Sequence, residues 1–177
     1  MVAIAALGLV SAVAVAATIN GTPGDDVLLG TSSADKIDGL GGDDLIFSAQ
    51  GNDTDRGGSG RDRIEGGSGR DRLDGGSGDD FLLGDGREIT CPPGTTNLAY
   101  CSFGDAANPG SDHITGGGGD DRINGERGND RLEGGSNDDI IFGESGRDRI
   151  SGGSGRDRVS ADRRDRVARN CERVSRR

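Results

Sequence analysis

Large aliphatic side chains recur every nine residues along most of the chain, and small or polar residues fill the positions between them. Seven units run from Gly21 to Leu83 and six more from Ala107 to Ser160. Because successive side chains of a strand point to opposite faces, an aliphatic residue between polar ones predicts a very short strand with one side chain turned inward. The pattern therefore predicts an all-β protein of short strands and turns. The eighth position of the unit is aliphatic in twelve of the thirteen units: Leu28, Ile37, Ile46, Ile64, Leu73, Leu82, Ile114, Ile123, Leu132, Ile141, Ile150 and Val159.

Aspartate and glycine occupy the other constant positions of the unit. Position four is Gly in eleven units, with Ser33 and Asn137 as the exceptions. Glycine enters backbone conformations with positive φ at no steric cost, so the turn can bring peptide carbonyls and the aspartate toward one point. Calcium accepts about six to eight oxygen ligands in flexible geometry, which makes these aspartates candidate Ca2+ ligands. Position six is Asp in all thirteen units: Asp26, Asp35, Asp44, Asp53, Asp62, Asp71, Asp80, Asp112, Asp121, Asp130, Asp139, Asp148 and Asp157.

The unit itself resembles a known repeat. From Gly57 the chain reads GGSGRDRIE, GGSGRDRLD and GGSGDDFLL, which fits G-G-x-G-x-D-x-U-x with U aliphatic. This pattern is similar to the nonapeptide of RTX-type, haemolysin-like calcium-binding repeat proteins. A Gly-rich stretch alone could be a flexible linker, but thirteen phased copies exclude that reading.

The resemblance implies a parallel β-roll, a β-helix or solenoid of thirteen nonapeptide repeats. Two units form one coil, the turns lie on alternating sides, and each calcium ion lies between the turns of units n and n+2. Pairing within each block gives nine such sites, or eleven if the roll continues across the interruption between the blocks.

Composition favours a fold that depends on the metal. The chain has 35 glycines, 3% aromatic residues and a net charge of −10, which exclude an ordinary globular core in 177 residues. Low hydrophobicity with high net charge is typical of a disordered chain, so metal binding is expected to supply the folding energy. The acidity points to cation binding and away from nucleic acid.

The first 17 residues, MVAIAALGLVSAVAVAA, form an apolar run that ends in small residues. A transmembrane helix needs about 20 apolar residues, and Ala14-Val15-Ala16 and Val15-Ala16-Ala17 resemble A-x-A cleavage sites. Residues 1–17 are therefore interpreted as a secretory signal peptide. No Lys or Arg precedes the apolar run, which leaves two alternatives: a start further upstream, or a segment retained as a membrane anchor.

The calcium-binding roll is expected over residues 18–160, with an inserted loop at 84–106. This loop carries Cys91 and Cys101, which either form a disulfide in an oxidising compartment or are two free thiols. Residues 161–177 repeat the rhythm out of phase at Asp165-Arg166-Val167. We interpret them as a C-terminal cap over the open end of the roll; the alternative is a basic tail that touches anionic surfaces. Cys171 is either a buried small residue of that cap or a reactive thiol.

Asp55 breaks the pattern, because it holds an eighth position where the other units have an aliphatic residue. Burying an unpaired charge is costly, so we expect a local bulge that turns Asp55 outward, or a partner such as Arg56.

The outward positions also hold an apolar group: Val27, Leu29, Leu45 and Phe47, with Phe81 and Leu83 further along. Such a surface is either an interaction site or a patch covered by the insertion or by the segment before the first unit.

No catalytic constellation is present in the sequence, so we expect a protein that is not an enzyme. The single histidine, His113, holds an outward seventh position and is expected on the surface, and the chain lacks zinc-protease, nucleophile-elbow and nucleotide-binding motifs. The sequence predicts a secreted or cell-surface calcium-binding protein with a structural role. Alternatives are an adhesion or partner-binding module that calcium switches on, with an extracellular protein as partner, and an accessory fragment of a secreted enzyme.

Overall fold

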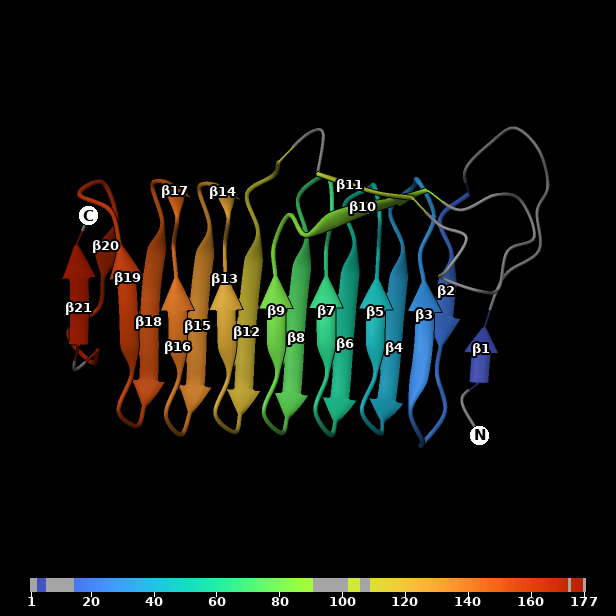
Figure 1. Ribbon diagram of the computed structural model, residues 1–177, viewed down its shortest axis with the longest axis horizontal. Helices are drawn as coiled ribbons and strands as arrows, with labels where there is room; N and C mark the ends of the chain where they lie inside the picture. The colour runs from blue at the N-terminus through green and yellow to red at the C-terminus, as the bar shows by residue number, and fades with distance from the viewer. Residues whose placement is uncertain (1–2, 6–14, 91–101, 106–108, 172, 177) are drawn as a thin grey trace.

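Two parallel β-sheets face each other along the whole molecule and are joined by turns at both edges (Figure 1). The computed structural model describes residues 3–5, 15–90, 102–105, 109–171 and 173–176. The first sheet has nine strands, in the order β1 (Ala3–Ala5), β3 (Asp26–Leu29), β5 (Leu45–Phe47), β7 (Arg63–Glu65), β9 (Phe81–Leu83), β13 (Arg122–Asn124), β16 (Ile140–Phe142), β19 (Arg158–Ala161) and β21 (Arg173–Arg176). The second has eight: β2 (Thr18–Asn20), β4 (Lys36–Gly41), β6 (Thr54–Ser59), β8 (Arg72–Ser77), β12 (His113–Gly118), β15 (Arg131–Ser136), β18 (Arg149–Ser154) and β20 (Arg166–Val167).

The chain alternates between the two sheets, so each strand pairs in parallel with the strand two units later. In the first sheet Ile46 lies beside Ile64, and in the second Leu132 lies beside Ile150. The register therefore stacks the eighth positions into one inward row on each wall. The expected all-β parallel roll is confirmed. The described residues contain no helix, and so none that could cross a membrane.

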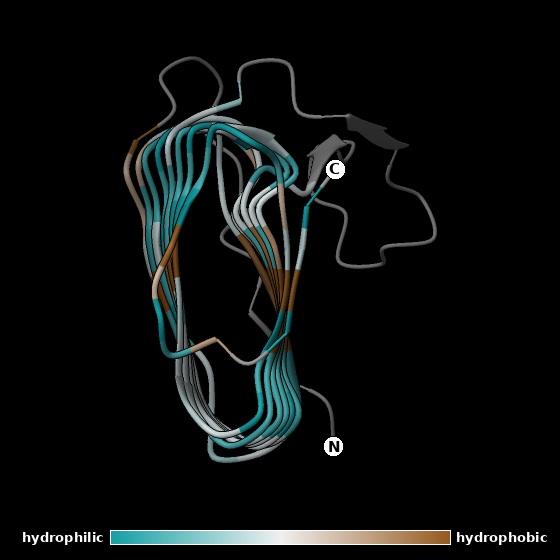
Figure 2. Ribbon diagram, turned by 90° about the vertical axis from the view of Figure 1, so that its left-hand side faces the viewer, coloured by the Kyte–Doolittle hydropathy of each residue, from teal (hydrophilic) through white to brown (hydrophobic). Residues whose placement is uncertain are grey.

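The core consists of these two inward rows. All twelve aliphatic residues of the eighth position are at most 2% exposed. Figure 2 looks along the roll and shows the hydrophobic residues on the two facing walls, with hydrophilic turns at the ends of each coil. The prediction that position eight points inward is confirmed.

The roll continues across the insertion. Strand β8 pairs with β12 and β9 pairs with β13, in the same register as elsewhere. Gly84 takes the first position of the interrupted turn, with its amide bonded to the carbonyl of Asn124 at 3.0 Å. The insertion therefore lies within a turn, whereas the expected boundaries of 84–106 placed Gly84 in the loop and Ala107 at the start of the unit. Within it, β10 (Arg87–Thr90) and β11 (Ser102–Asp105) form an antiparallel hairpin; Cys91, Cys101 and Ala107 lie outside the described residues.

Further along the same edge, two short strands pair in parallel, β14 (Arg127–Gly128) and β17 (Ser145–Gly146). Residues after 160 add another coil, because β20 pairs with β18 and β21 pairs with β19. Val167 and Cys171 pack partly buried against the end of the core. Val174 stays 40% exposed. This coil is one residue shorter, since Val167 lies beside Ile150, and that explains the shifted rhythm in the sequence.

Candidate calcium sites in the turns

One hydrogen-bond ladder connects the aspartates of position six along each edge of the roll. The amide of Asp44 donates to Oδ1 of Asp62 in the next coil at 2.9 Å, and the same bond recurs from coil to coil. It also spans the insertion, from Asp71 to Asp112 at 2.8 Å. Each of these aspartates except Asp26, the first, is thereby held in place by one of its two carboxylate oxygens.

The second oxygen of the carboxylate is buried and has no hydrogen-bond partner in eleven of these residues. A buried polar atom without a partner is costly, and a charged one more so. These oxygens are Oδ2 of Asp44, Asp53, Asp62, Asp71, Asp80, Asp112, Asp121, Asp130, Asp139, Asp148 and Asp157.

Glycine at position one leaves space beside ten of the eleven free oxygens, and the exception is Asp53, whose unit begins with Ser48. A Cβ built on Gly66 would lie 2.7 Å from Oδ2 of Asp71 and 2.5 Å from the carbonyl oxygen of Gly84 in the next turn. A Cβ on Gly125 would lie 2.7 Å from Oδ2 of Asp130 and 3.2 Å from the carbonyl oxygen of Gly143. Carboxylate and carbonyl oxygens thus meet between adjacent turns. They are the donors that Ca2+ prefers, so the site fits this ion.

Most ligands of such an ion must be backbone carbonyls. Within the part of the chain that the structure describes, no group of three Asp, Glu, His or Cys side chains converges on one point. Bound Ca2+ would neutralise the buried carboxylates of position six and would connect one turn to the next.

Burial raises the pKa of these carboxyl groups. For Asp112 and Asp130 the pKa rises to about 8, because desolvation outweighs the lowering effect of the backbone hydrogen bond and neighbouring carboxylates add repulsion. The same causes raise the pKa of Asp53, Asp80 and Asp139 to about 7 and that of Asp44, Asp71, Asp121 and Asp148 to about 6. Proteins that hold carboxylates in this way require either protons or a cation to neutralise them.

The first two turns are built differently. The amide of Thr31 donates to Oδ2 of Asp35 at 2.5 Å, while the Ala17 amide and the Thr31 hydroxyl occupy Oδ1 at 2.6 and 3.1 Å. Oδ2 of Asp26 accepts from the amide of Thr22, and only its Oδ1 is free. Of the thirteen predicted ligands, Asp35 is therefore the one whose two oxygens both have protein partners.

Backbone conformation separates these turns from the interior ones. In the interior turns, the described residues at positions two and four have positive φ, with the exception of Gly110, even where the residue is Leu40 (φ 76°), Glu126 (φ 66°) or Asn137 (φ 82°). The β-branched threonines at position two, Thr22 and Thr31, do not adopt positive φ, since that region is especially unfavourable for such residues. Their amides turn toward the aspartate instead.

The comparison with known families agrees with this geometry. The sequence model of the RTX calcium-binding nonapeptide repeat (four copies) matches residues 20–55, 56–86, 106–132 and 133–163. The chain belongs to this family. As an RTX repeat protein it carries calcium-binding nonapeptides in a parallel β-roll. No curated protein matches the chain.

Asp55 departs from this repeat, and it has a partner as expected, but the partner is not Arg56 and the strand has no bulge. Strand β6 shows no bulge, since Asp55 pairs in register between Ile37 and Leu73 and is fully buried. Arg56 instead pairs with exposed Asp74 at 3.8 Å. The partner of Asp55 is Ser48, whose hydroxyl donates to its Oδ2 at 2.5 Å. Burial raises the pKa of Asp55 well above its usual range, and the hydrogen bond from Ser48 offsets part of this rise.

Sequence reasoning missed Ser48, although a signal existed. Ser48 stands at position one of the same unit, where most units have glycine. Two exceptions in one unit were a sign that they contact each other.

The outward apolar group is partly covered. Phe47 is only 6% exposed, and Glu65 of the next coil is 2% exposed with Gly86 of the insertion against it. Arg63 pairs with Glu65 and stacks over the ring of Phe81 at 4.5 Å. His113 lies half-exposed on the second sheet, with its Nδ1 3.5 Å from Nη2 of Arg72.

Proposed function

We propose that this protein is a secreted, non-catalytic calcium-binding roll whose folding is driven by Ca2+ and which serves a structural or cell-surface role. The observation that carries the proposal is the set of eleven buried aspartate oxygens without protein partners. Placing so many carboxylates in a roll without a cation opposes folding, because each must be desolvated without compensation. Calcium bound between adjacent turns would stabilise only the folded state, because the ligands come together only when the roll is folded.

The continuous roll supports the larger number of sites. Turns six and eight and turns seven and nine are neighbours, so the spaces between adjacent turns extend across the insertion. This arrangement offers up to eleven spaces between the turns of the thirteen units.

Secretion is supported by the N-terminal segment and by the demands of the sites. Extracellular calcium modules bind at roughly 10⁻⁴–10⁻³ M, which suits ions held largely by carbonyls. Of the two candidate cleavage points, the one after Ala16 retains Ala17. That residue is 7% exposed, and its amide bonds to Oδ1 of Asp35. Cleavage there would place the new terminal ammonium beside this carboxylate, a favourable pair.

Circular dichroism of the full chain with calcium or with a chelator tests the proposal. We expect mostly coil in the chelator and β-structure in millimolar calcium, with magnesium much less effective because it demands a smaller, octahedral site. Calorimetry should then report many ions per chain. A chelated protein that keeps its full β-signal, or one or two bound ions, would contradict the proposal.

A further inference from the structure

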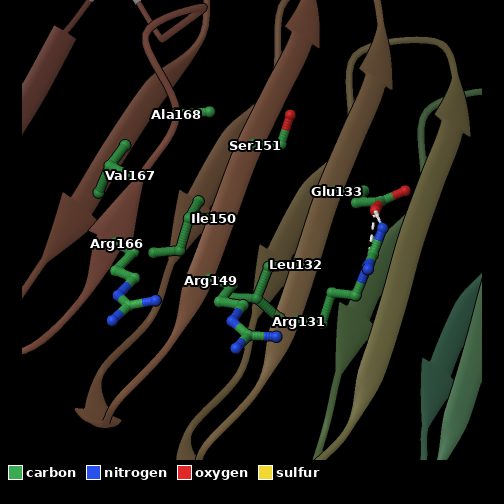
Figure 3. A pocket seen from close by; sticks show the side chains of 9 residues that line it. All are labelled: Arg131, Leu132, Glu133, Arg149, Ile150, Ser151, Arg166, Val167 and Ala168. Carbon is green, nitrogen blue, oxygen red and sulfur yellow. Dashed lines mark hydrogen bonds and ion pairs between the residues drawn. The ribbon is translucent and has the colours of Figure 1, made fainter.

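A groove with arginine on one wall crosses the outer face of the second sheet near its C-terminal end. It is lined by positions seven to nine of β15, β18 and β20 and encloses about 350 Å³. One wall carries Arg131, Arg149 and Arg166; the other carries Glu133, Ser151 and Ala168 (Figure 3).

Two of these arginines have no partner within the described residues. Arg131 forms an ion pair with Glu133, to which its guanidinium turns back in Figure 3. Arg149 and Arg166 are exposed and reach the other way, and the residues opposite them, Ser151 and Ala168, carry no charge. One wall of the groove therefore carries two arginine side chains whose positive charge no described residue neutralises.

The strand register fixes the spacing of the cations. Arg149 lies beside Arg131 on one side and Arg166 on the other, and the same row continues through His113 to Arg72. Neighbouring strands are about 4.8 Å apart, so Arg149 and Arg166 start from backbone positions about that far apart along the roll. A guanidinium binds carboxylate or sulfate through two parallel hydrogen bonds.

Calcium would make this end of the molecule basic. Residues 107–177 contain fourteen acidic and fourteen basic residues, whereas residues 1–106 contain seventeen acidic and seven basic ones. Seven of the fourteen acidic residues are buried in turns: Asp112, Asp121, Asp130, Asp139, Asp148, Asp157 and Asp165. When cations neutralise turn carboxylates, the outward charge of this half becomes positive, and its field attracts polyanions.

From these observations we infer that the groove binds a linear acidic polysaccharide, whose carboxylates contact Arg149 and Arg166 in the calcium-loaded protein. The positive groups lie in single file, which fits one extended chain rather than a membrane surface. Sites for single-stranded nucleic acid combine a basic groove with stacking aromatics, and the residues that line this groove include none. The inference rests on the proposed calcium-dependent fold, because the row exists only in the folded roll.

The test measures binding of a short fluorescent oligogalacturonide to the full chain in millimolar calcium. The double variant Arg149→Gln/Arg166→Gln should bind about tenfold more weakly, since two charge-assisted contacts are lost. The matched control Arg122→Gln/Arg158→Gln removes the same charge from exposed seventh positions of the first sheet. It should change the affinity by no more than about twofold. Both variants are measured with the same probe and the same calcium concentration, so any binding of calcium by the sugar affects the two affinities equally.

Three arms decide the outcome. A neutral oligoglucan should not bind, and a single-stranded oligonucleotide and anionic vesicles should bind more weakly than the acidic sugar. Equal losses in both double variants, stronger binding of the oligonucleotide or vesicles, or no binding of the acidic sugar would overturn the inference. Circular dichroism of the same samples separates the two proposals. Folding with calcium but no sugar binding defeats this inference alone, whereas no folding transition defeats the proposed function.

Discussion

The interior turns and the first two turns of the roll hold the same aspartate in different ways. In an interior turn, the aspartate at position six accepts the backbone amide of the preceding coil through one oxygen and keeps a second buried oxygen free, as at Asp71. In the second turn, Thr31 and Ala17 satisfy both oxygens of Asp35. The repeat therefore does not by itself create a metal site. Among the turns whose position two is described, a free Oδ2 occurs where the residue at position two has positive φ.

The last turn of the roll follows the pattern of the first two. Asp165 accepts the amide of Asp148 at 3.0 Å through Oδ1 and the amide of Asp162 at 2.6 Å through Oδ2. The second turn and the last turn thus satisfy both carboxylate oxygens with protein amides, whereas the interior turns leave one oxygen free. A turn at the end of the roll has a neighbouring turn on one side only, so an ion bound there would lack half of its ligands. Hydrogen bonds from protein amides remove the need for such an ion.

Acid should replace calcium in the interior turns, which is the largest effect that this comparison predicts. Nine interior carboxyls have a pKa raised to between about 6 and about 8 in the folded protein. The folded chain then binds more protons than the unfolded chain, so stability is present below those values and is lost as pH rises through them. In a chelator, the β-signal in circular dichroism should therefore rise when pH falls from about 8 to about 5.

With calcium in excess the same titration should be nearly flat above neutral pH, and affinity for the ion should fall as protons compete for the carboxylates. A chelated protein whose β-signal falls steadily on acidification would contradict the raised pKa values as the reason for instability.

Single substitutions test the comparison turn by turn. Asp71→Asn keeps an oxygen for the amide of Asp53 but removes the charge and the free Oδ2. We expect it to lose up to two bound ions and to lower the free energy of unfolding in calcium by about 2–4 kcal/mol. The matched change Asp35→Asn should leave the number of ions unchanged and cost about 1 kcal/mol, for one weakened hydrogen bond.

Calorimetric ion counts and thermal melting of both variants provide the measurement. Equal ion losses at the two positions would show that the protein bonds of Asp35 give way to calcium, and the distinction between the two kinds of turn would disappear.

A smaller effect than that of Asp71→Asn is expected in the fourth unit, where the interior pattern is broken. Asp55→Leu replaces a buried carboxyl with the aliphatic residue that other units have, and should raise the free energy of unfolding in calcium by about 1–2 kcal/mol. Because it leaves the hydroxyl of Ser48 without its bond to Asp55, Ser48→Gly/Asp55→Leu should be at least as stable. Denaturant melts of the three proteins would measure this, and a lower stability of both variants would mean that the pair contributes more than the core residue it displaces.

The nine-residue period was sufficient to predict the fold, because one spacing determines strand, register and inward face together. It placed Leu28, Ile123 and the other core residues correctly, since each depends only on its own unit. Contacts between positions were harder to predict. The Ser48–Asp55 pair joins a turn to a strand of its unit. The role of Gly84 was hidden because the second block, counted back in nines from Asp112, begins at Ala107.

The nine-residue period also could not predict which aspartate oxygens are hydrogen-bonded and which are free. Position six reads Asp in every unit, and only the side chain at position two, as at Thr31, separates a bonded carboxylate from a free one. The arginine groove was visible as a row of seventh positions. The sequence could not show which of these arginines lack a partner, because the ion pair between Arg131 and Glu133 depends on side-chain conformation.

The hairpin within the eighth turn shows how such a protein can acquire new parts. The strands before and after it pair as if nothing intervened, because a turn needs its two ends in place and sets no limit on the chain between them. Closing a longer loop costs little, since the entropy grows only with the logarithm of its length. Any turn of the roll is thus a position where an inserted segment can be accommodated. The number of coils between two such insertions sets the distance between them.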